Sequence, residues 1–318
     1  MSAKPSVMRG RSNVSQSTNL WKDILRDRYL YLMFLPIIVY YLIFKYGPMY
    51  GAVIAFQNFR FADGIWGSDW VGFRHFASLF GSRDFYMVLK NTLLLNIYNV
   101  LFGFPVPIFL AILLNEVRNR VFKRTVQSLL YIPHFISWVV LGGIWISLLS
   151  PSTGVINILL HKVFHMEPVY FLADKFWWPV FFVISGIWQG AGWGTIIYLA
   201  SITNIDPQLY EASYVDGASK WQQIWHITLP GIRSTIAILL ILRMGGMMNI
   251  GFEHVFVLQN SAVRSVSEVI STFVYRAGIL NTQYSYTTAV GLFQSLVSMI
   301  LILSTNKIVK LLGEEGLW

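Results

Sequence analysis

Six stretches of the chain are long and apolar enough to form membrane-spanning helices, which need about 20 mostly apolar residues each. They are Tyr29–Tyr46, Asn91–Leu114, Leu129–Leu149, Trp177–Ala200, Ile232–Leu258 and Thr287–Thr305. The fifth stretch is the least regular, because Arg243, Asn249, Glu253 and His254 interrupt it. The hydrophobic pattern therefore predicts an all-α, polytopic membrane protein with six transmembrane helices.

The composition agrees with this prediction. The chain is 55% hydrophobic and 12% charged, whereas a soluble domain carries about a quarter charged residues. Aromatic residues make up 16% of the chain, and many lie beside the apolar stretches, as they do in the aromatic belts of membrane proteins. The sequence has no cysteine, which excludes disulfides, zinc-thiolate sites and iron–sulfur clusters.

The distribution of Lys and Arg predicts which side of the membrane each loop occupies. The ten-residue connector Asn115–Arg124 carries four positive charges between the second and third stretches, and short basic loops of this kind stay in the cytoplasm. We therefore expect a cytoplasmic N-terminal segment (1–28), a membrane domain (29–305) and a cytoplasmic C-terminal tail (306–318), with the first stretch kept as an uncleaved anchor. Because the basic residues are dispersed, the net charge of +9 indicates topology rather than nucleic-acid binding.

Two predicted outer loops are long, Gly47–Leu89 and Gln259–Tyr286. Loops of this length usually have a function or a fold of their own. We expect short helices there that cap the outer mouth, and a purely structural plug is equally consistent with the sequence.

The loop 204–230, cytoplasmic by this topology, contains the signals of a helix, a tight turn and a second helix. Asp206 suits the N-cap and Pro207 the first helical position, and Gly217 is suited to end that helix. Ser219 with Gln222 three residues later is a capping-box pattern, and Pro230 marks the entrance to the fifth stretch. Capping alone leaves two interpretations open, a hairpin that grips a partner and a surface hairpin without one.

The sequence Glu211-Ala-Ser-Tyr-Val-Asp-Gly-Ala218, followed by Ile227-Thr-Leu-Pro230, resembles the EAA loop of type I ABC importer permeases. In that family the loop holds the coupling helix that docks on the ATPase subunit. The resemblance implies this role for Tyr210, Glu211, Ala212, Ser213, Tyr214, Asp216, Gly217 and Ala218. Ser213 departs from the pattern, which has a second alanine there, and its small size should preserve close packing.

Shorter segments extend the resemblance. Three of them are similar to the carbohydrate-uptake branch of these permeases: Val71–Phe76, Asn91-Thr-Leu and Leu130–Pro133. Two more are similar to the permeases for complex oligosaccharides and polysaccharide fragments: Gly251–Asn260 and Ser267–Tyr275. The resemblance implies a bacterial inner-membrane protein that pairs with a second homologous permease, two ATPase subunits and an extracytoplasmic solute-binding protein. The chain lacks G-x-x-x-x-G-K-[ST], so we expect no cofactor of its own and no enzymatic activity, with ATP and Mg bound by the ATPase subunits.

Polar side chains within the apolar stretches are candidates for the substrate pathway, because they are costly at membrane depth and usually face a cavity or a partner. These candidates are Asn96, Asn99, Gln189, Trp193, Arg243, Asn249, Glu253 and His254. Helical spacing predicts Arg243 and His254 on one face of the fifth helix, with Glu253 either paired with His254 or at the outer rim. Arg243 is compatible with an acidic, uronate-type glycan as substrate, although a neutral glycan fits nearly as well. A structural role is equally open, in which Arg243 bonds to carbonyls or an acid on a partner subunit.

Two other functional classes compete with the importer interpretation. An ion-coupled secondary transporter usually keeps acidic residues near the midplane, but the first four stretches contain no Asp or Glu. A membrane-embedded glycan or lipid transferase needs a clustered acid, base or metal site. The histidine pair His161 and His165 lies in a predicted loop and is weak evidence for one, so we predict no metal site.

Overall fold

The computed structural model describes residues 26–314, 316 and 317, and the chain divides into two compact units, residues 1–52 and 53–318. The described part of the first unit is one helical run made of α2 (Arg28–Tyr41), η1 (Leu42–Tyr46) and α3 (Gly47–Met49), which η2 (Tyr50–Phe56) extends into the second. Every side chain of α2 and η1 is exposed, as expected for a span that lipid surrounds. Most of the predicted N-terminal segment 1–28 lies outside the described residues.

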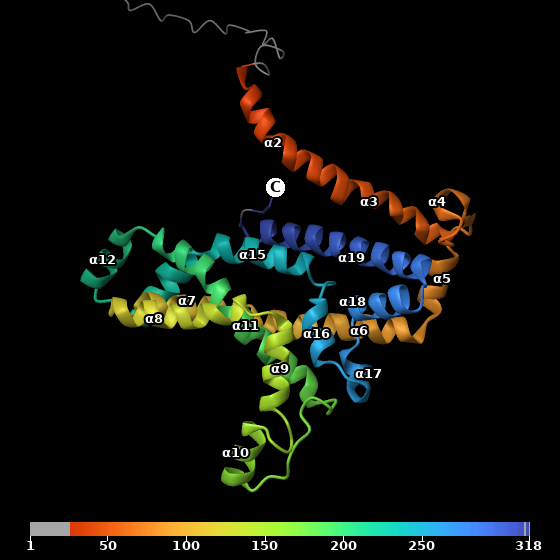
Figure 1. Ribbon diagram of the computed structural model, residues 1–318. Helices are drawn as coiled ribbons and strands as arrows, with labels where there is room; N and C mark the ends of the chain where they lie inside the picture. The colour runs from red at the N-terminus through yellow and green to blue at the C-terminus, as the bar shows by residue number, and fades with distance from the viewer. Residues whose placement is uncertain (1–25, 315, 318) are drawn as a thin grey trace, which may run out of the picture. The chain divides into compact units, whose positions relative to one another are not determined.

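Long apolar helices form the frame of the second unit (Figure 1). They are the run of α6 (Arg83–Tyr98), η3 (Asn99–Gly103) and α7 (Pro105–Glu116), then α11 (Trp177–Thr203) and α19 (Tyr284–Leu311). With Arg28–Phe56, the described chain has 4 helices long and apolar enough to cross a membrane, or up to 6 if two bent pairs each count as one span. The predicted number of spans is reached only on the second count.

The third predicted stretch is not a straight helix. It is divided among α8 (Arg120–Tyr131), η4 (Ile132–Phe135) and α9 (Trp138–Leu148), and the axis bends by 102° between η4 and α9, where Ile136 and Ser137 are extended. The helix also starts earlier than predicted, because Asn119 caps it by accepting bonds from the backbone N–H groups of Val121 and Phe122. The basic connector is thus shorter than predicted.

The prediction of one continuous fifth helix is wrong. The stretch consists of α15 (Arg233–Gly245), a break, and α16 (Phe252–Leu258). Side chains satisfy three carbonyls of the break: Asn96 Nδ2 donates to Met247 O (2.7 Å), Gln294 Nε2 to Met248 O (2.9 Å) and Ser271 Oγ to Ile250 O (3.1 Å). Since lipid offers no hydrogen bonds, a broken helix at membrane depth needs such partners.

Both predicted outer loops contain short helices, as expected. The first holds a hairpin of β1 (Gln57–Asn58) and β2 (Asp69–Trp70), with α4 (Gly64–Gly67) between the strands, followed by α5 (Arg74–Gly81). The second holds η6 (Ser261–Val263), α17 (Arg264–Ser267), α18 (Ile270–Val274) and η7 (Tyr275–Leu280). A further short helix, α10 (Val155–Phe164), lies between α9 and α11 in the sequence. The sequence did not predict the hairpin, which is the only departure from an all-α fold among the described residues.

The helices α15 and α19 lie side by side and are joined at several levels (Figure 1). At the α12 end of the unit, Arg233 forms an ion pair with Glu314 and donates to Leu312 O (2.9 Å). At the other end of α15, its last residue, Gly245, lies so close to α19 that a Cβ there would clash with Ile302. Helix α19 continues to Leu311, so the start of the predicted tail is helical.

Candidate functional site: a capped hairpin and a membrane groove

The loop 204–230 folds as the capping signals predict. It forms α12 (Pro207–Val215) and α13 (Lys220–Gln223), then η5 (Ile224–Thr228) and α14 (Leu229–Gly231), which lead into α15 with a bend of 59°. Asp206 Oδ1 accepts a bond from Gln208 N (2.9 Å), and Gly217 has φ +76°, a conformation that suits glycine. Ser219 and Gln222 form the predicted capping box.

The inner face of this hairpin is held by a chain of side-chain hydrogen bonds. The Tyr210 hydroxyl lies 2.9 Å from Thr228 Oγ1, Gln223 Nε2 donates to Ser213 Oγ (2.9 Å), and that hydroxyl donates to Tyr210 O (2.8 Å). Ser213, the departure from the family pattern, therefore ties the two helices together, which alanine could not do. Sequence reasoning missed both this role and Gln223.

Away from these bonds, α12 is open to solvent and exposes three large apolar side chains among polar ones. Leu209, Tyr214 and Val215 are 52%, 80% and 86% exposed, and we call these three residues the apolar face of α12. Of the other predicted coupling residues, Glu211, Ala212, Asp216 and Gly217 are exposed as well, while Ala218 is half-buried. Large apolar side chains in this position indicate a surface that a partner covers.

The membrane groove is a cavity of about 430 Å³ between η3, α7, α11 and α15. Gly186, Gly190 and Gly194 follow one another at four-residue intervals along α11 and line it, so one strip of its wall carries no side chains. Its polar groups include Asn99 and Arg243. No acid or carbonyl among the described residues pairs with the Arg243 guanidinium, which leaves its donors available to a ligand.

An aromatic stack borders the groove at Gly186. It consists of Trp178, Phe182, His254 and Trp138, with successive ring centroids 5.2, 4.0 and 3.5 Å apart. His254 Nε2 lies 2.9 Å from Ser185 Oγ, and a Cβ at Gly186 would come within 3.3 Å of the His254 ring. The ring of His254 is thereby fixed from both faces and one edge.

Of the eight predicted pathway residues, the structure thus places two, Asn99 and Arg243, in the lining of the groove and a third, His254, beside the groove-lining Gly186. The prediction that Arg243 and His254 share a helix face is wrong, because the helix breaks between them. The predicted partnership of Glu253 with His254 is also absent, since Glu253 is exposed and His254 faces Ser185.

The remaining candidates lie elsewhere. Asn96 stabilises the break after α15. Gln189 Nε2 donates to His134 O (3.4 Å) and Trp193 stacks on the His134 ring (4.7 Å), so both support the break after α8. Asn249 lines a separate cavity of about 880 Å³ along α15 and α19. No cluster of three or more potential metal ligands occurs in the described part of the chain.

Comparison with known proteins identifies the family. The model of the "binding-protein-dependent transport system inner membrane component" family matches residues 103–314. The polygalacturonan/rhamnogalacturonan transport system permease protein YteP of Bacillus subtilis is 50% identical over 295 residues, covering 93% of this chain and 92% of YteP. The chain belongs to this permease family.

Other relatives of the permease agree. Protein LplB of Bacillus subtilis is 47% identical over 293 residues, which cover 92% of each chain. A chain in the crystal structure of a bacterial alginate ABC transporter, in complex with alginate pentasaccharide-bound periplasmic protein, has a TM-score of 0.86 and 42% identity. That match covers 94% of this permease and 99% of that chain. The resemblance to ABC importer permeases of the carbohydrate branch is confirmed.

Proposed function

We propose that this permease is one of two transmembrane subunits of an ABC importer that takes up acidic, uronate-containing oligosaccharides or polysaccharide fragments. Its partners are a second homologous permease, two ATPase subunits that bind ATP and Mg, and an extracytoplasmic solute-binding protein. It lies in the bacterial inner membrane with both termini in the cytoplasm. It hydrolyses no ATP itself and translocates the glycan by alternating access.

The capped hairpin of α12 and α13 is the observation that carries this proposal. Its internal hydrogen bonds make it a rigid unit, and its apolar face is exposed in the single chain. An ATPase subunit that covers this face would move the hairpin as one body. Lys220 Nζ, 3.0 Å from Glu116 Oε2, links that movement to the end of α7, and α14 links it to α15.

The groove supports an acidic substrate. Arg243 presents a planar fork of donors that matches a carboxylate, and no acid among the described residues competes for it. Of the relatives named above, YteP is a permease of polygalacturonan/rhamnogalacturonan transport and the solved structure is that of an alginate transporter. A further solved structure, 43% identical to this permease with a TM-score of 0.85, is of a transporter involved in the import of "the acidic polysaccharide alginate". A uronate carboxylate at Arg243 would account for both observations.

The family assignment excludes the ion-coupled secondary transporter that the sequence left open, and the chemistry of the buried acids agrees. Such a carrier needs a carboxylate that can bind and release an ion near the middle of the membrane. Among the described residues, Glu268 is the one acid that is fully buried, and two arginines already pair with it. It is therefore not free to carry an ion.

The test is reconstitution of the complete importer in proteoliposomes with oligogalacturonate as substrate. Val215→Asp places a charge on the apolar face of α12 without touching the bonds inside the hairpin. Val163→Asp, at a 63% exposed position on α10, is the matched control. We expect Val215→Asp to lower substrate-stimulated ATP hydrolysis about 30-fold, the loss of a typical interface hot spot, while the control stays near the native rate. A chain that never associates with an ATPase, or Val215→Asp transport at the native rate, would refute the proposal.

A further inference from the structure

A second polar site lies at the end of the unit opposite the coupling hairpin, and it is built around Arg276. In Figure 1, α12 and α5 mark these opposite ends. A cavity of about 340 Å³ opens between the junction of α5 with α6 and the junction of η7 with α19. Its polar lining residues are Ser78, Ser82, Asp84, Arg276, Asn281, Gln283 and Tyr286. None of them lines the groove.

Arg276 is held in place by a buried acid. Glu268 is 2% exposed, and its Oε1 accepts a 2.7 Å bond from Arg276 Nε, while Oε2 accepts one from Arg264 Nε (3.1 Å). The segment that carries Glu268 is fixed to α6 by Asn91 Nδ2, which donates to Ser265 O and Glu268 O (3.0 and 3.1 Å). A buried carboxylate with this many partners is a rigid anchor.

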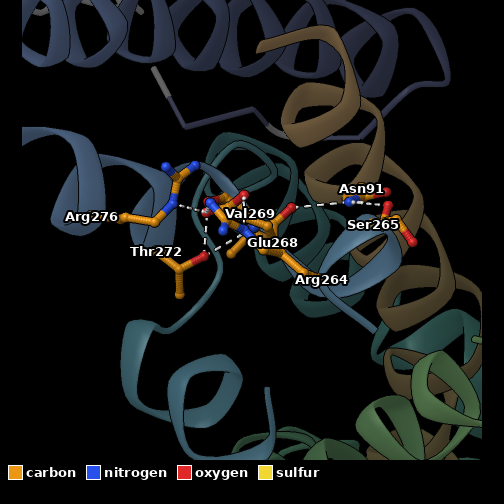
Figure 2. A network of polar contacts seen from close by, with 7 residues as sticks. All are labelled: Asn91, Arg264, Ser265, Glu268, Val269, Thr272 and Arg276. Carbon is orange, nitrogen blue, oxygen red and sulfur yellow. Dashed lines mark hydrogen bonds and ion pairs between the residues drawn. The ribbon is translucent and has the colours of Figure 1, made fainter. Parts of the chain in front are cut away.

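The anchor leaves the binding end of Arg276 free. Only Nε bonds to Glu268, and Figure 2 shows the two terminal nitrogens turned away from that carboxylate. No described residue accepts a bond from them, and the guanidinium lies over the Phe273 ring at 5.3 Å. Arg276 therefore presents two pre-oriented donors to the cavity, with little side-chain entropy left to lose on binding.

The rest of the lining indicates what these donors meet. Asp84 gives the cavity a negative charge to balance Arg276, so a free carboxylate is disfavoured there, whereas sugar hydroxyls can accept from Arg276 and donate to Asp84. Between Asn281 and Gln283, Thr282 has φ +57°, an unusual conformation for a β-branched residue. This turn directs two amide side chains to the rim of the cavity.

We propose that this cavity, which we call the outer pocket, binds the hydroxyl edge of a sugar unit in the trailing part of the glycan while the leading part occupies the groove. The inference rests on the proposed function. Asp84 and Asn99 lie on one helical run, 15 residues apart in sequence, which corresponds to about 22 Å at 1.5 Å per residue. A long oligosaccharide can reach both sites and a short one cannot.

The test compares uptake of two probes, trigalacturonate and octagalacturonate, by the complete reconstituted importer. Arg276→Lys keeps the charge but loses the fork, and Gln283→Ala removes a rim amide outside the Glu268 network. We expect the KM for the octamer to rise about tenfold and about threefold, respectively, as losing a charged or a neutral hydrogen bond implies. The KM for the trimer and both kcat values should stay unchanged.

Arg264→Gln is the control, because Arg264 also pairs with Glu268 but does not line the outer pocket; it should show no dependence on substrate length. Equal effects on trimer and octamer would overturn the inference, since they would indicate a folding defect or a contact with the binding protein. No effect on either probe would overturn it as well. If the native complex imports neither probe, the proposed function itself fails, whereas import of both with variants that do not discriminate length refutes the outer pocket alone.

Discussion

Arg243 in the groove and Arg276 in the outer pocket are the same residue type in opposite settings. Arg276 commits one of its five N–H donors to a buried carboxylate, and Arg243 has no acidic partner among the described residues. The fold therefore depends on the charge of Arg276, whereas it leaves the whole guanidinium of Arg243 for a ligand. A cation that contributes little to folding, yet lines a cavity in a membrane protein, is the better candidate for substrate contact.

The largest expected effect tests whether the ion pairs of Glu268 stabilise the fold and Arg243 does not. Glu268→Gln removes the charge between two guanidiniums and should destabilise the protein by about 3 kcal/mol, because breaking a buried ion pair leaves charges uncompensated. Arg243→Gln should change stability by less than about 0.5 kcal/mol. Thermal unfolding of the purified importer in detergent measures both. Equal destabilisation by the two variants would remove the distinction between the arginines.

The second effect tests the ligand side. Arg243→Gln should lower kcat/KM for oligogalacturonate about 30-fold, which corresponds to about 2 kcal/mol for a lost charge-assisted hydrogen bond. Arg243→Lys should recover part of that loss, since the charge remains but the fork does not. Uptake of a neutral oligosaccharide of equal length serves as the control, and a loss of similar size there would show that Arg243 does not recognise acid groups.

A smaller effect is expected for the neutral hydrogen bond between Gln223 and Ser213 inside the hairpin, which, like the Glu268 ion pairs, holds two segments together. Ser213→Ala removes the acceptor of Gln223 and should cost about 1 kcal/mol. Because this bond joins the two helices, glycan taken up per ATP hydrolysed should fall severalfold. Thr203→Ala, which loses only an exposed hydroxyl bonded to Ala200 O, should keep the native ratio. A native ratio in Ser213→Ala would mean that the hairpin does not depend on this bond for its rigidity.

The smallest effect compares the two partners of Glu268. The Arg264 side chain is 46% exposed, against 30% for Arg276. Water screens the more exposed pair, so Arg264→Gln should cost about 1 kcal/mol or less, and the cost should shrink further in high salt. Chemical unfolding at two salt concentrations provides the measurement. An Arg264→Gln cost as large as that of Glu268→Gln would show that Arg264, and not Arg276, is the main partner.

The hairpin could be predicted in detail because its signals are local. Asp206, Gly217 and the Ser219–Gln222 pair each act within a few residues, and all adopt the expected conformations. The positions of the apolar helices could also be predicted, because a helix that spans the lipid bilayer needs a minimum length of apolar residues. What the hairpin binds could be inferred only from its resemblance to a family.

The breaks and the outer network could not be predicted, because they depend on contacts between distant parts of the chain. The break after α15 is stabilised by Asn96 and Gln294, which are far from it in sequence. Hydropathy alone therefore predicts one continuous helix across the break. Glu268 looks like an ordinary loop acid until Asn91 fixes its segment to α6. The available clue was an acid in a largely apolar segment with one arginine before it and one after it, Arg264 and Arg276.

The pairing of α15 with α19 has a mechanical consequence. The ion pair of Arg233 with Glu314 joins the two helices at the first residue of α15, Gly245 packs against Ile302 at its last residue, and Gln294 donates to Met248 O just beyond it. A pair of helices joined at these three places moves as one rigid unit. In the proposed importer, a movement of the hairpin would therefore pass through α14 and α15 to the non-helical turn beside Met248, where the backbone can bend.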